Sequence, residues 1–380
     1  MYHTCQKRIE QTDQLDFLAH ECGKVYSRCV DIFHRVWRKK GFWLSEKSMK
    51  RLVRNSNLHS QTVQGVIEKF YENLSSYNEL KKVFPNTKPP RKRKWYFTIP
   101  YKSSAIHLKD GVLKLSNGRG NEPLAIPWQH TEPKTLEISF NLGYRVNATY
   151  VLENTEIPLG NKVASIDLGE IILAATHEED GSTTLYNGRV WRSKQRYLNK
   201  TDAKFKELMS RCRKGSKRWK RLKRAKNRIH ARINNQKEDI LHKQTTKLVN
   251  TLHEKQVGTV VMGDARFIRL ADKTRKKSNQ AQHVHQMPTG KVRHKITYKA
   301  NRKGMKVELI NEAYTSRVCP ACKELNHTNG RVYKCESCNL VLHRDEVGAI
   351  NILAKQKYRE YVPVVGDMTP PIGVRYSSVA

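Results

Sequence analysis

The amino-acid sequence predicts a multidomain α+β protein, and three observations support this fold class. Apolar residues at helical spacings run through residues 1 to about 85. Short alternating segments separated by Gly, Asn and Pro fill about 94 to 153. From Lys162 onward, strand-like and helix-like segments follow one another. A chain of 380 residues is long enough for two or three domains with separate cores.

The N-terminal part divides into a helical region and a β-rich region. Leu15, Val25 and Phe33 belong to an apolar set that recurs at helical spacings among charged residues. The stretch KPPRKRKWYF (88–97) is a basic linker with aromatic residues, a composition that suits phosphate contact and base stacking. Five segments then have the pattern of an antiparallel sheet or small barrel: WYFTIPY, IHL, VLKL, LEISF and ATYVL.

The C-terminal part has the element order of a ribonuclease-H-like α/β layer. VASIDLG is an apolar strand that ends in an acid and a glycine, and IILAATHEE and TTLYN are its expected hairpin partners. A basic helical region (190–255), the strand VGTVVM and a polar loop at about 272–290 come next. KVELINEAY is a further strand candidate, and DEVGAINILAK a helix. The order strand, hairpin, helix, strand, helix predicts the layer.

The charge balance indicates a polyanionic partner. Lysine and arginine total 72 against 35 acidic residues, a formal net charge of +37 that strains a compact fold unless phosphates offset it. No apolar run approaches the roughly 18 residues of a membrane span, and the N-terminus MYHTCQKRIEQ lacks the apolar core of a signal peptide. We therefore expect a cytoplasmic protein that binds nucleic acid and no membrane.

Four of the eight cysteines predict a structural zinc site. Cys319 and Cys322 form one CxxC pair, Cys335 and Cys338 form another, and twelve residues separate the pairs. Two such knuckles place four sulfurs in the tetrahedron that zinc prefers, with no position left for substrate. An iron–sulfur site or a redox role is the alternative. The other cysteines have the scattered spacing of ordinary thiols: Cys5, Cys22, Cys29 and Cys212.

Two acids are candidates for metal-dependent phosphodiester cleavage, which needs carboxylates from separate elements around cations about 4 Å apart. Asp167 follows a buried strand and precedes a glycine segment, at the sheet edge where α/β folds bind ligands. Asp345 begins the helix after the cysteines. A turn or capping acid is the alternative for Asp167, and a helix N-cap for Asp345.

A dense basic segment predicts a nucleic-acid contact. Residues 211–232 contain twelve lysines and arginines and no acid, with Trp219, Leu222 and Ile229 on a narrow apolar stripe. Such a run repels itself unless phosphates neutralise it, although a solvated surface is the alternative. The candidate contacts are Arg211, Arg213, Lys214, Lys217, Arg218, Lys220, Arg221, Lys223, Arg224, Lys226 and Arg228.

These segments together resemble the TnpB family of insertion-sequence-encoded, RNA-guided nucleases, which is similar to the ancestors of type V CRISPR effectors. The resemblance covers about 160–356 and is carried by ASIDLGE, NNQKEDILHKQTTKLV, VVMGD and the block from NEAYTSRVCPAC to HRDEVGAINI. It implies a RuvC-like domain with a zinc ribbon inserted before its last helix, preceded by a β-barrel (wedge) and a helical recognition domain. Asp167 matches the first catalytic acid of the family, and Asp345 the third.

The resemblance also implies partners, cofactors and domain limits. The partners are a guide RNA transcribed from the element's own end and target DNA, and the cofactors are structural zinc and two catalytic magnesium ions. The setting is a prokaryotic cytoplasm, with association to the nucleoid. The expected domains are 1–90 (helical recognition, with the first wedge strand), 91–158 (wedge), 159–312 (RuvC-like, with basic helices 190–255), 313–341 (zinc ribbon), 342–357 (last RuvC helix) and 358–380 (flexible tail).

The second catalytic acid departs from the family pattern. Most relatives carry a glutamate directly after the strand VGTVVM, where this chain has Gly263, which cannot bind a metal. Asp264 would tend to point to the opposite face of the sheet, because side chains alternate along a strand. Glu312 follows the neighbouring strand and could reach the same edge, so we favour Glu312 over Asp264. A strand-end glutamate paired with a basic residue is the structural alternative.

The sequence thus predicts a divalent-metal-dependent, RNA-guided DNA endonuclease that cuts beside a short flanking motif. Asp167, Glu312 and Asp345 would hold the magnesium ions. Two alternatives stay open: an RNA-guided DNA-binding repressor that no longer cuts, and a zinc-ribbon DNA-binding protein that uses no guide.

Overall fold

The computed structural model describes residues 2–93, 96–151, 157–264, 282, 286–327, 330–359 and 370–377. The chain forms two compact units, Met1–Glu153 and Asn154–Ala380, and each has its own hydrophobic core. Most of the polar loop expected at about 272–290, and Lys94 and Trp95 of the basic linker, lie outside the described residues. No helix in the described ranges is both long enough and apolar enough to cross a membrane.

The first unit contains a helical layer whose ends are set by local capping. The Thr12 side chain accepts a hydrogen bond from the Leu15 amide at the start of the first helix, and Gly41 ends that helix with a φ of 70°. Tyr26, Phe33 and Phe70 pack edge to face between the first and third helices. The helices are α1 (Asp13–Lys40), α2 (Glu46–Leu52) and α3 (Ser60–Val83).

The strands of the first unit form two antiparallel sheets in the described residues, with orders β1-β7-β6-β2 and β3-β4-β5. The N-terminal strand, β1, lies before the helices and pairs with β7 along its whole length. Closure of these sheets into a barrel remains a prediction. The strands are β1 (Tyr2–Ile9), β2 (Ile99–Lys102), β3 (Ile106–Lys109), β4 (Val112–Leu115), β5 (Leu124–Pro127), β6 (Thr135–Phe140) and β7 (Tyr144–Val151), with a short 3-10 turn at Ser103–Ala105.

The second unit is built on a mixed sheet, with the order β12-β11-β8-β9-β10-β15 in the described residues. The strands β8, β11 and β12 are parallel, whereas β9 runs antiparallel to both β8 and β10. The strands are β8 (Lys162–Asp167), β9 (Ile172–Glu178), β10 (Thr183–Asn187), β11 (Val257–Gly263), β12 (Lys306–Ile310) and β15 (Ile372–Val374), and β13 (Val332–Lys334) and β14 (Val341–His343) form a separate hairpin.

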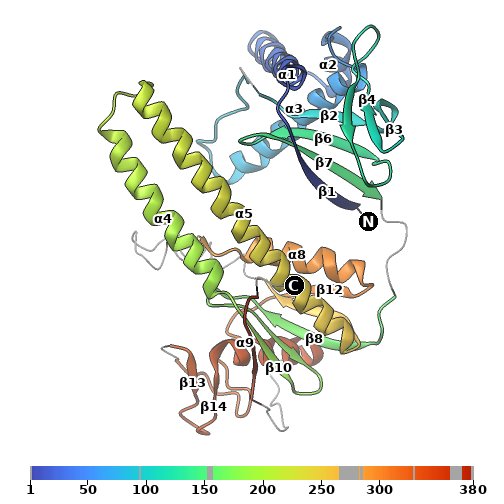
Figure 1. Cartoon of the computed structure of the whole chain (residues 1–380). Coiled ribbons are helices and arrows are strands. Elements are labelled where there is room, and N and C mark those ends of the chain that lie inside the picture. The colour runs from blue at the N-terminus through green and yellow to red at the C-terminus, as the bar shows by residue number, and fades with distance from the viewer. Residues whose placement is uncertain are drawn as a thin grey trace. The chain divides into compact units, whose positions relative to one another are not determined.

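Helices cover both faces of this sheet, and the alternation of side chains along β8 decides which residues meet which helix. Ala164 and Ile166 enter the core formed with α5 and α8, whereas Ser165 and Asp167 face α9. Helices α4 and α5 lie side by side as a long hairpin that extends past the sheet (Figure 1). The helices are α4 (Arg189–Ser210), α5 (Lys217–Glu254), α8 (Thr289–Arg302) and α9 (Arg344–Tyr358).

Two elements of this unit differ from the sequence-based expectation. Helix α8 was not expected, because its apolar residues Val292, Ile296 and Ala300 are isolated among basic ones. The tail was expected to be flexible, but Ile372–Val374 pairs with β10 as an edge strand. The Tyr376 hydroxyl then donates to Asp239 of α5 at 2.9 Å, which anchors this part of the tail.

Helix α9 is fixed to its surroundings by two buried polar side chains. The Ser165 hydroxyl of β8 donates to the Ala349 carbonyl at 2.6 Å. The Asn351 amide donates to the Thr315 and Val318 carbonyls at 2.7 and 2.8 Å. These bonds tie the start of the cysteine module and the end of β8 to the same helix.

We predict that Asn351→Ala destabilises the second unit. Two buried carbonyls would lose their donor, so the free energy of unfolding should fall by about 2–4 kcal/mol. Urea denaturation followed by circular dichroism measures this. Asn250→Ala, at an exposed position on α5, is the matched control. Equal midpoints for the two variants would contradict the anchoring role of Asn351.

Candidate active site and metal centre

Five carboxylates from separate elements of the second unit line one pocket with a volume of about 610 Å³. They come from the end of β8, the turn between β8 and β9, the residue after β11, the segment after β12 and the start of α9. Two arginines share the pocket walls. The charged residues are Asp167, Glu170, Asp264, Glu312, Asp345, Arg331 and Arg344.

Asp167 ends β8 on the face that α9 covers. A β-carbon at Gly348 of α9 would collide with the Asp167 carboxylate, so the absence of a side chain at 348 makes room for it. Burial raises the pKa of Asp167 to about 7, and the nearby Asp345 and Glu312 carboxylates add to this effect. The group therefore carries a charge at neutral pH only at a considerable electrostatic cost, which a bound cation would remove.

Glu312 occupies the space beside Gly263. Gly263 is aligned with Ile310 of β12, and a β-carbon at position 263 would collide with the Glu312 carboxylate. The Glu312 Oε1 atom is buried and has no hydrogen-bond partner among the described residues. Burial, assisted by the Asp264 carboxylate, raises the pKa of Glu312 to about 7. The carboxylate thus lies where a side chain at 263 would begin, and one of its oxygens lacks a partner.

Asp264 points toward the other face of the sheet. Its amide donates to the Ile310 carbonyl at 2.8 Å, which extends the β11–β12 pairing by one residue. Its carboxylate forms an ion pair with Arg293 of α8 at 3.1 Å, and the side chain is only 8% exposed. The alternation expected from the sequence is therefore observed, and Asp264 has a basic partner on the α8 side.

Asp345 is not the cap of α9, contrary to the structural alternative left open by the sequence. His343 is the N-cap: its Nδ1 atom accepts a hydrogen bond from the Asp345 amide at 3.2 Å, and Glu346 completes a capping box. The Asp345 carboxylate instead accepts a hydrogen bond from Arg331 at 3.0 Å. Its side chain therefore faces the pocket without a capping role.

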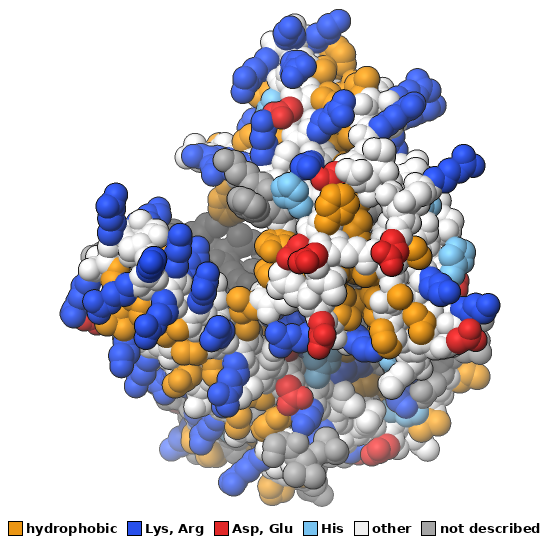
Figure 2. Space-filling model, turned by 45° about the horizontal axis from the view of Figure 1, so that its top comes forward, with side chains coloured by type: hydrophobic (Ala, Val, Ile, Leu, Met, Phe, Trp, Pro, Cys, Tyr) orange, Lys and Arg blue, Asp and Glu red, His pale blue; other side chains and the backbone are white. Residues whose placement is uncertain are grey.

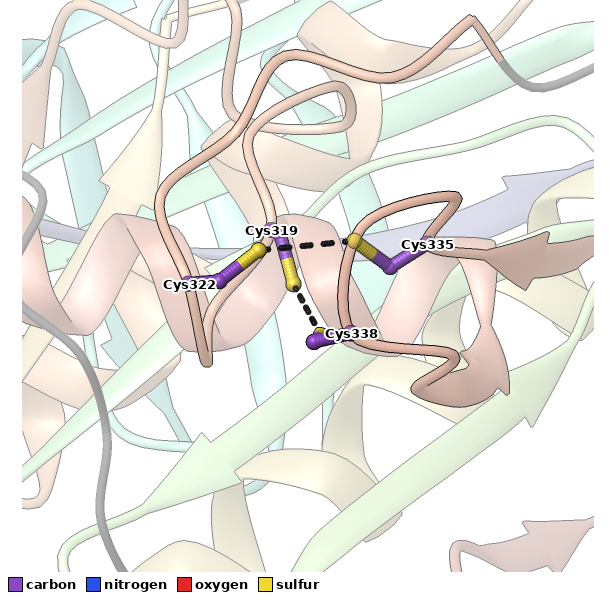
Figure 3. Close-up of side chains that lie close together, drawn as sticks. All are labelled: Cys319, Cys322, Cys335 and Cys338. Carbon is purple, nitrogen blue, oxygen red and sulfur yellow. Dashed lines mark hydrogen bonds between the residues drawn. The ribbon is translucent and has the colours of Figure 1, made fainter.

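The four cysteines meet as the sequence predicts, and their sulfurs point toward one another in Figure 3. The Cys319 and Cys338 sulfurs lie 3.6 Å apart, and the Cys322 and Cys335 sulfurs 3.4 Å apart. Four sulfurs at about 2.3 Å from one zinc ion lie roughly 3.8 Å from each other. In a search of the described residues for three or more His, Cys, Asp or Glu side chains whose ligand atoms lie within 4.8 Å of one another, these four cysteines form the group found. The pocket acids are more widely spread.

Backbone geometry prepares each cysteine knuckle for a metal. Lys323 and Asn339, directly after the second cysteine of each pair, have positive φ values of 66° and 58°. Burial raises the pKa of the Cys335 thiol. Hydrogen bonds from the backbone amides of Cys338 and Ser337 outweigh this effect, so the pKa falls to about 6. Cys319, Cys335 and Tyr333 pack against Val347 of α9. The module therefore rests on the helix that carries Asp345.

The basic residues named from the sequence lie on the turn between α4 and α5 and on the first part of α5, and ten of the eleven are exposed. Lys226 differs: it is half-buried and forms an ion pair with Asp202 of α4 at 2.5 Å. Figure 2 shows Lys and Arg side chains crowded over this hairpin, at the left of the view. The remaining ten are exposed, and Arg211 among them pairs with the exposed Glu207 of α4.

Sequence reasoning did not pair three arginines with the acids of this site. Arg192 pairs with Glu170 at 3.1 Å, and Arg293 and Arg331 pair with Asp264 and Asp345. Their partners are distant in sequence, so no local spacing could reveal the pairs. The position of Arg331 between the two cysteine pairs was the available signal.

Comparisons with known proteins agree with this architecture. A family model described as a probable transposase, OrfB of IS605, matches residues 143–269, and a Cas12f1-like TNB domain model matches 290–352. In a cryo-EM structure of the Cas12f1–sgRNA–target DNA complex, one chain is similar with a TM-score of 0.58 at 13% identity. The similarity covers 89% of this chain and 81% of that chain, and it shows a shared fold.

Relatives in sequence carry related names. A TnpB-like protein of Acidianus two-tailed virus is 31% identical over 201 residues, which cover 52% of this chain and 42% of the viral protein. A second, from Methanocaldococcus jannaschii, is 32% identical over 138 residues, 36% of this chain and 49% of that protein. The chain thus spans less than half the length of both.

A longer match is to a protein of Streptomyces pristinaespiralis that is named as a candidate RNA-guided DNA endonuclease. It is 26% identical over 349 residues, which cover 87% of this chain and 82% of the relative. The two family models and the named relatives together support a member of the TnpB family.

Proposed function

We propose that this chain is an RNA-guided, divalent-metal-dependent DNA endonuclease of a transposable element, which cuts target DNA beside a short flanking motif. The observation that carries the proposal is the pocket into which Asp167, Glu312 and Asp345 converge from separate elements. The guide RNA would come from the element's own end, as the family resemblance implies.

The topology of the second unit supports a RuvC-like catalytic domain. Three parallel strands, with an antiparallel hairpin added at β8, are what the ribonuclease-H-like order requires. The pocket lies where β8 and β11 end, at the carboxyl edge at which open α/β sheets bind ligands. The cysteine module lies between β12 and α9, where the family carries its zinc ribbon.

The pocket residues fit divalent cations. Hard cations such as Mg²⁺ take carboxylate oxygens as ligands, and Glu312 Oε1 has no hydrogen-bond partner in the part of the chain that the structure describes. Acids spread around a pocket suit a site for two ions better than a closed site for one ion. When bound, the two ions would lower the pKa of the attacking water and stabilise the leaving oxygen. Asp167, Glu312 and Asp345 would hold them, and Asp264 would remain paired with Arg293.

The same pocket favours a nuclease over a guided binder that no longer cuts. A binder would have no need for two acids that form no ion pair among the described residues and whose pKa values lie near 7, because they lower the stability of the fold. The exposed cations of the α4–α5 hairpin would contact the phosphates of the guide RNA and its DNA hybrid without reading sequence.

Cleavage of a DNA library with randomised flanking positions tests the proposal. The protein is expressed with its cognate RNA and assayed with and without Mg²⁺. We expect cuts beside one short motif, and only with the metal. Intact DNA under every condition would overturn the nuclease proposal, and a preparation that carries no RNA yet binds DNA would favour the guide-independent alternative.

The assignment of Glu312 as the second catalytic acid can be tested by removing this carboxylate and placing another at position 263. We predict that Glu312→Ala slows cleavage at least about a hundredfold, as expected for loss of a group that stabilises the transition state. Gly263→Glu combined with Glu312→Ala should recover part of the rate, because the new carboxylate enters the space that Glu312 leaves. Asp264→Ala is the matched control and should keep most of the wild-type rate, because the Asp264 carboxylate is paired with Arg293 and would hold no metal.

The assignment would be contradicted if Asp264→Ala did not cut DNA while Glu312→Ala cut it at the wild-type rate. Circular dichroism of each variant separates loss of chemistry from loss of fold.

The raised pKa values predict a pH-dependent stability. Asp167 binds its proton more tightly in the folded than in the unfolded protein, so the metal-free fold loses stability as pH rises from about 4 toward 7. Asp167→Asn should therefore be more stable than wild type at pH 8 without magnesium, by at most about 4 kcal/mol. The difference should disappear near pH 4. Thermal unfolding in magnesium-free buffer measures it, and a wild type more stable than Asp167→Asn at pH 8 would contradict it.

Zinc content tests the cysteine module. We predict one zinc ion per chain by elemental analysis, loss of that zinc in Cys335→Ser, and a lower unfolding temperature, because metal binding and folding are coupled. Cys212→Ser, a half-buried thiol outside the module, is the control and should retain zinc. Iron with a visible absorption band in place of zinc would contradict the prediction.

A further inference from the structure

Three buried polar side chains form a row across the sheet of the second unit, on the face that α9 covers. Ser165 of β8 is aligned with His177 of β9, and His177 is aligned with Thr183 of β10. Their side chains belong to residues that are 0, 5 and 1% exposed. Side chains two positions apart on a strand share a face, so the next row on this face begins with Asp167. The polar row therefore adjoins the row that carries the first candidate catalytic acid.

Each member of the polar row has a hydrogen-bond partner, as buried polar groups require. The Ser165 hydroxyl donates to the Ala349 carbonyl of α9 at 2.6 Å. His177 Nδ1 and Thr183 Oγ1 lie 2.9 Å apart and share a hydrogen bond. The Thr183 side chain also forms a hydrogen bond with the Glu346 carboxylate of α9. The row is thus connected to α9 at two points, one of them in the first turn of the helix.

The hydrogen bonds that join His177, Thr183 and Glu346 run in one direction. Burial lowers the pKa of His177, so its ring is neutral at neutral pH. The Thr183 hydroxyl has a single proton, which it donates to the Glu346 carboxylate. The Thr183 oxygen is then left to accept, so the neutral ring of His177 carries its proton on Nδ1. The histidine therefore fixes the orientation of the hydroxyl that contacts Glu346.

Glu346 joins this row to the turn that carries the third candidate acid. Glu346 is 1% exposed, and its Oε2 atom also accepts a hydrogen bond from the His343 amide at 3.3 Å. The His343 ring in turn accepts from the Asp345 amide at 3.2 Å. Asp345 directly precedes Glu346 in the first turn of α9. A displacement of the Glu346 carboxylate would therefore move the backbone from which the Asp345 side chain extends.

We propose that Thr183 and Glu346 are positioning residues for the third catalytic acid: their hydrogen bond holds the first turn of α9 against β10 and thereby sets where the Asp345 carboxylate lies. The inference rests on the proposed nuclease function. Ser165 contacts the second turn of α9, through the Ala349 carbonyl, and leaves the first turn to Thr183. Neither Thr183 nor Glu346 is among the residues that line the pocket, so both would act through Asp345.

Thr183→Val tests the proposal, because it removes the hydroxyl and keeps the shape of the side chain. We predict that the cleavage rate of the complex with guide RNA and DNA, at saturating Mg²⁺, falls at least about tenfold, as expected when a reacting group is slightly misplaced. The affinity for target DNA should not change, because the exposed cations of the α4–α5 hairpin are unaltered. Thr183→Ser, which retains the hydroxyl, should recover most of the rate.

Thr184→Val is the matched control. It makes the same change one residue along β10, at a side chain that is 4% exposed and points to the opposite face of the sheet. It should cut at the wild-type rate. Glu346→Gln tests the other end of the hydrogen bond, because an amide offers one acceptor oxygen where a carboxylate offers two. It should also slow cleavage, and the double variant should lose less than the product of the two single losses, because both changes break one contact.

The measurements use the full chain with its guide RNA: single-turnover cleavage, target DNA binding and circular dichroism. A wild-type rate in Thr183→Val, or a control Thr184→Val as slow as Thr183→Val, would overturn the inference while wild-type cleavage still supports the function. If Thr183→Val does not fold, Glu346→Gln decides, and a wild-type rate in that variant would overturn the inference. Wild type that does not cut would overturn the proposed function, and the inference with it.

Discussion

The close approach of α9 to the end of β8 is the constraint on which the rest of the site depends. Gly348 on the helix leaves room for the Asp167 carboxylate, and Gly263 on β11 leaves room for that of Glu312. The Ser165 and Asn351 hydrogen bonds hold the helix at this separation. Because Asp345 lies in the first turn of α9, the same packing brings the third acid to the pocket.

The electrostatics of the pocket follow from this geometry. Burial and mutual repulsion hold the pKa values of Asp167 and Glu312 near neutrality, so the metal-free pocket is a strained arrangement. The other three acids of the pocket each form an ion pair, with Arg192, Arg293 or Arg331. The exposed cations of the α4–α5 hairpin and the two pocket acids that form no ion pair among the described residues belong to one charge distribution, which would attract phosphates and divalent ions.

Much of the second unit could be predicted from the sequence, because the relevant signals are local. The CxxC spacing, the apolar strand before Asp167 and the small residues of α9 each need only a few neighbouring positions. Helix α8 was missed because its apolar stripe is sparse, and the edge strand Ile372–Val374 because pairing with β10 joins residues far apart in sequence.

The choice between Glu312 and Asp264 could be argued from strand alternation, but the reason that Gly263 is tolerated required three dimensions. Only the folded chain reveals that the space of a side chain at 263 is filled by Glu312. The arginine partners of the acids are likewise tertiary contacts, and so is the role of His343 as the α9 cap in place of Asp345.

The central claim is that Asp167, Glu312 and Asp345 form a site for two divalent ions while Asp264 remains outside it. The number of Mn²⁺ ions bound per chain, measured at pH 8 by electron paramagnetic resonance in the absence of DNA, tests this most directly. The account predicts about two ions for wild type and Asp264→Asn, and fewer for Glu312→Gln. Loss of binding in Asp264→Asn together with full binding in Glu312→Gln would contradict it.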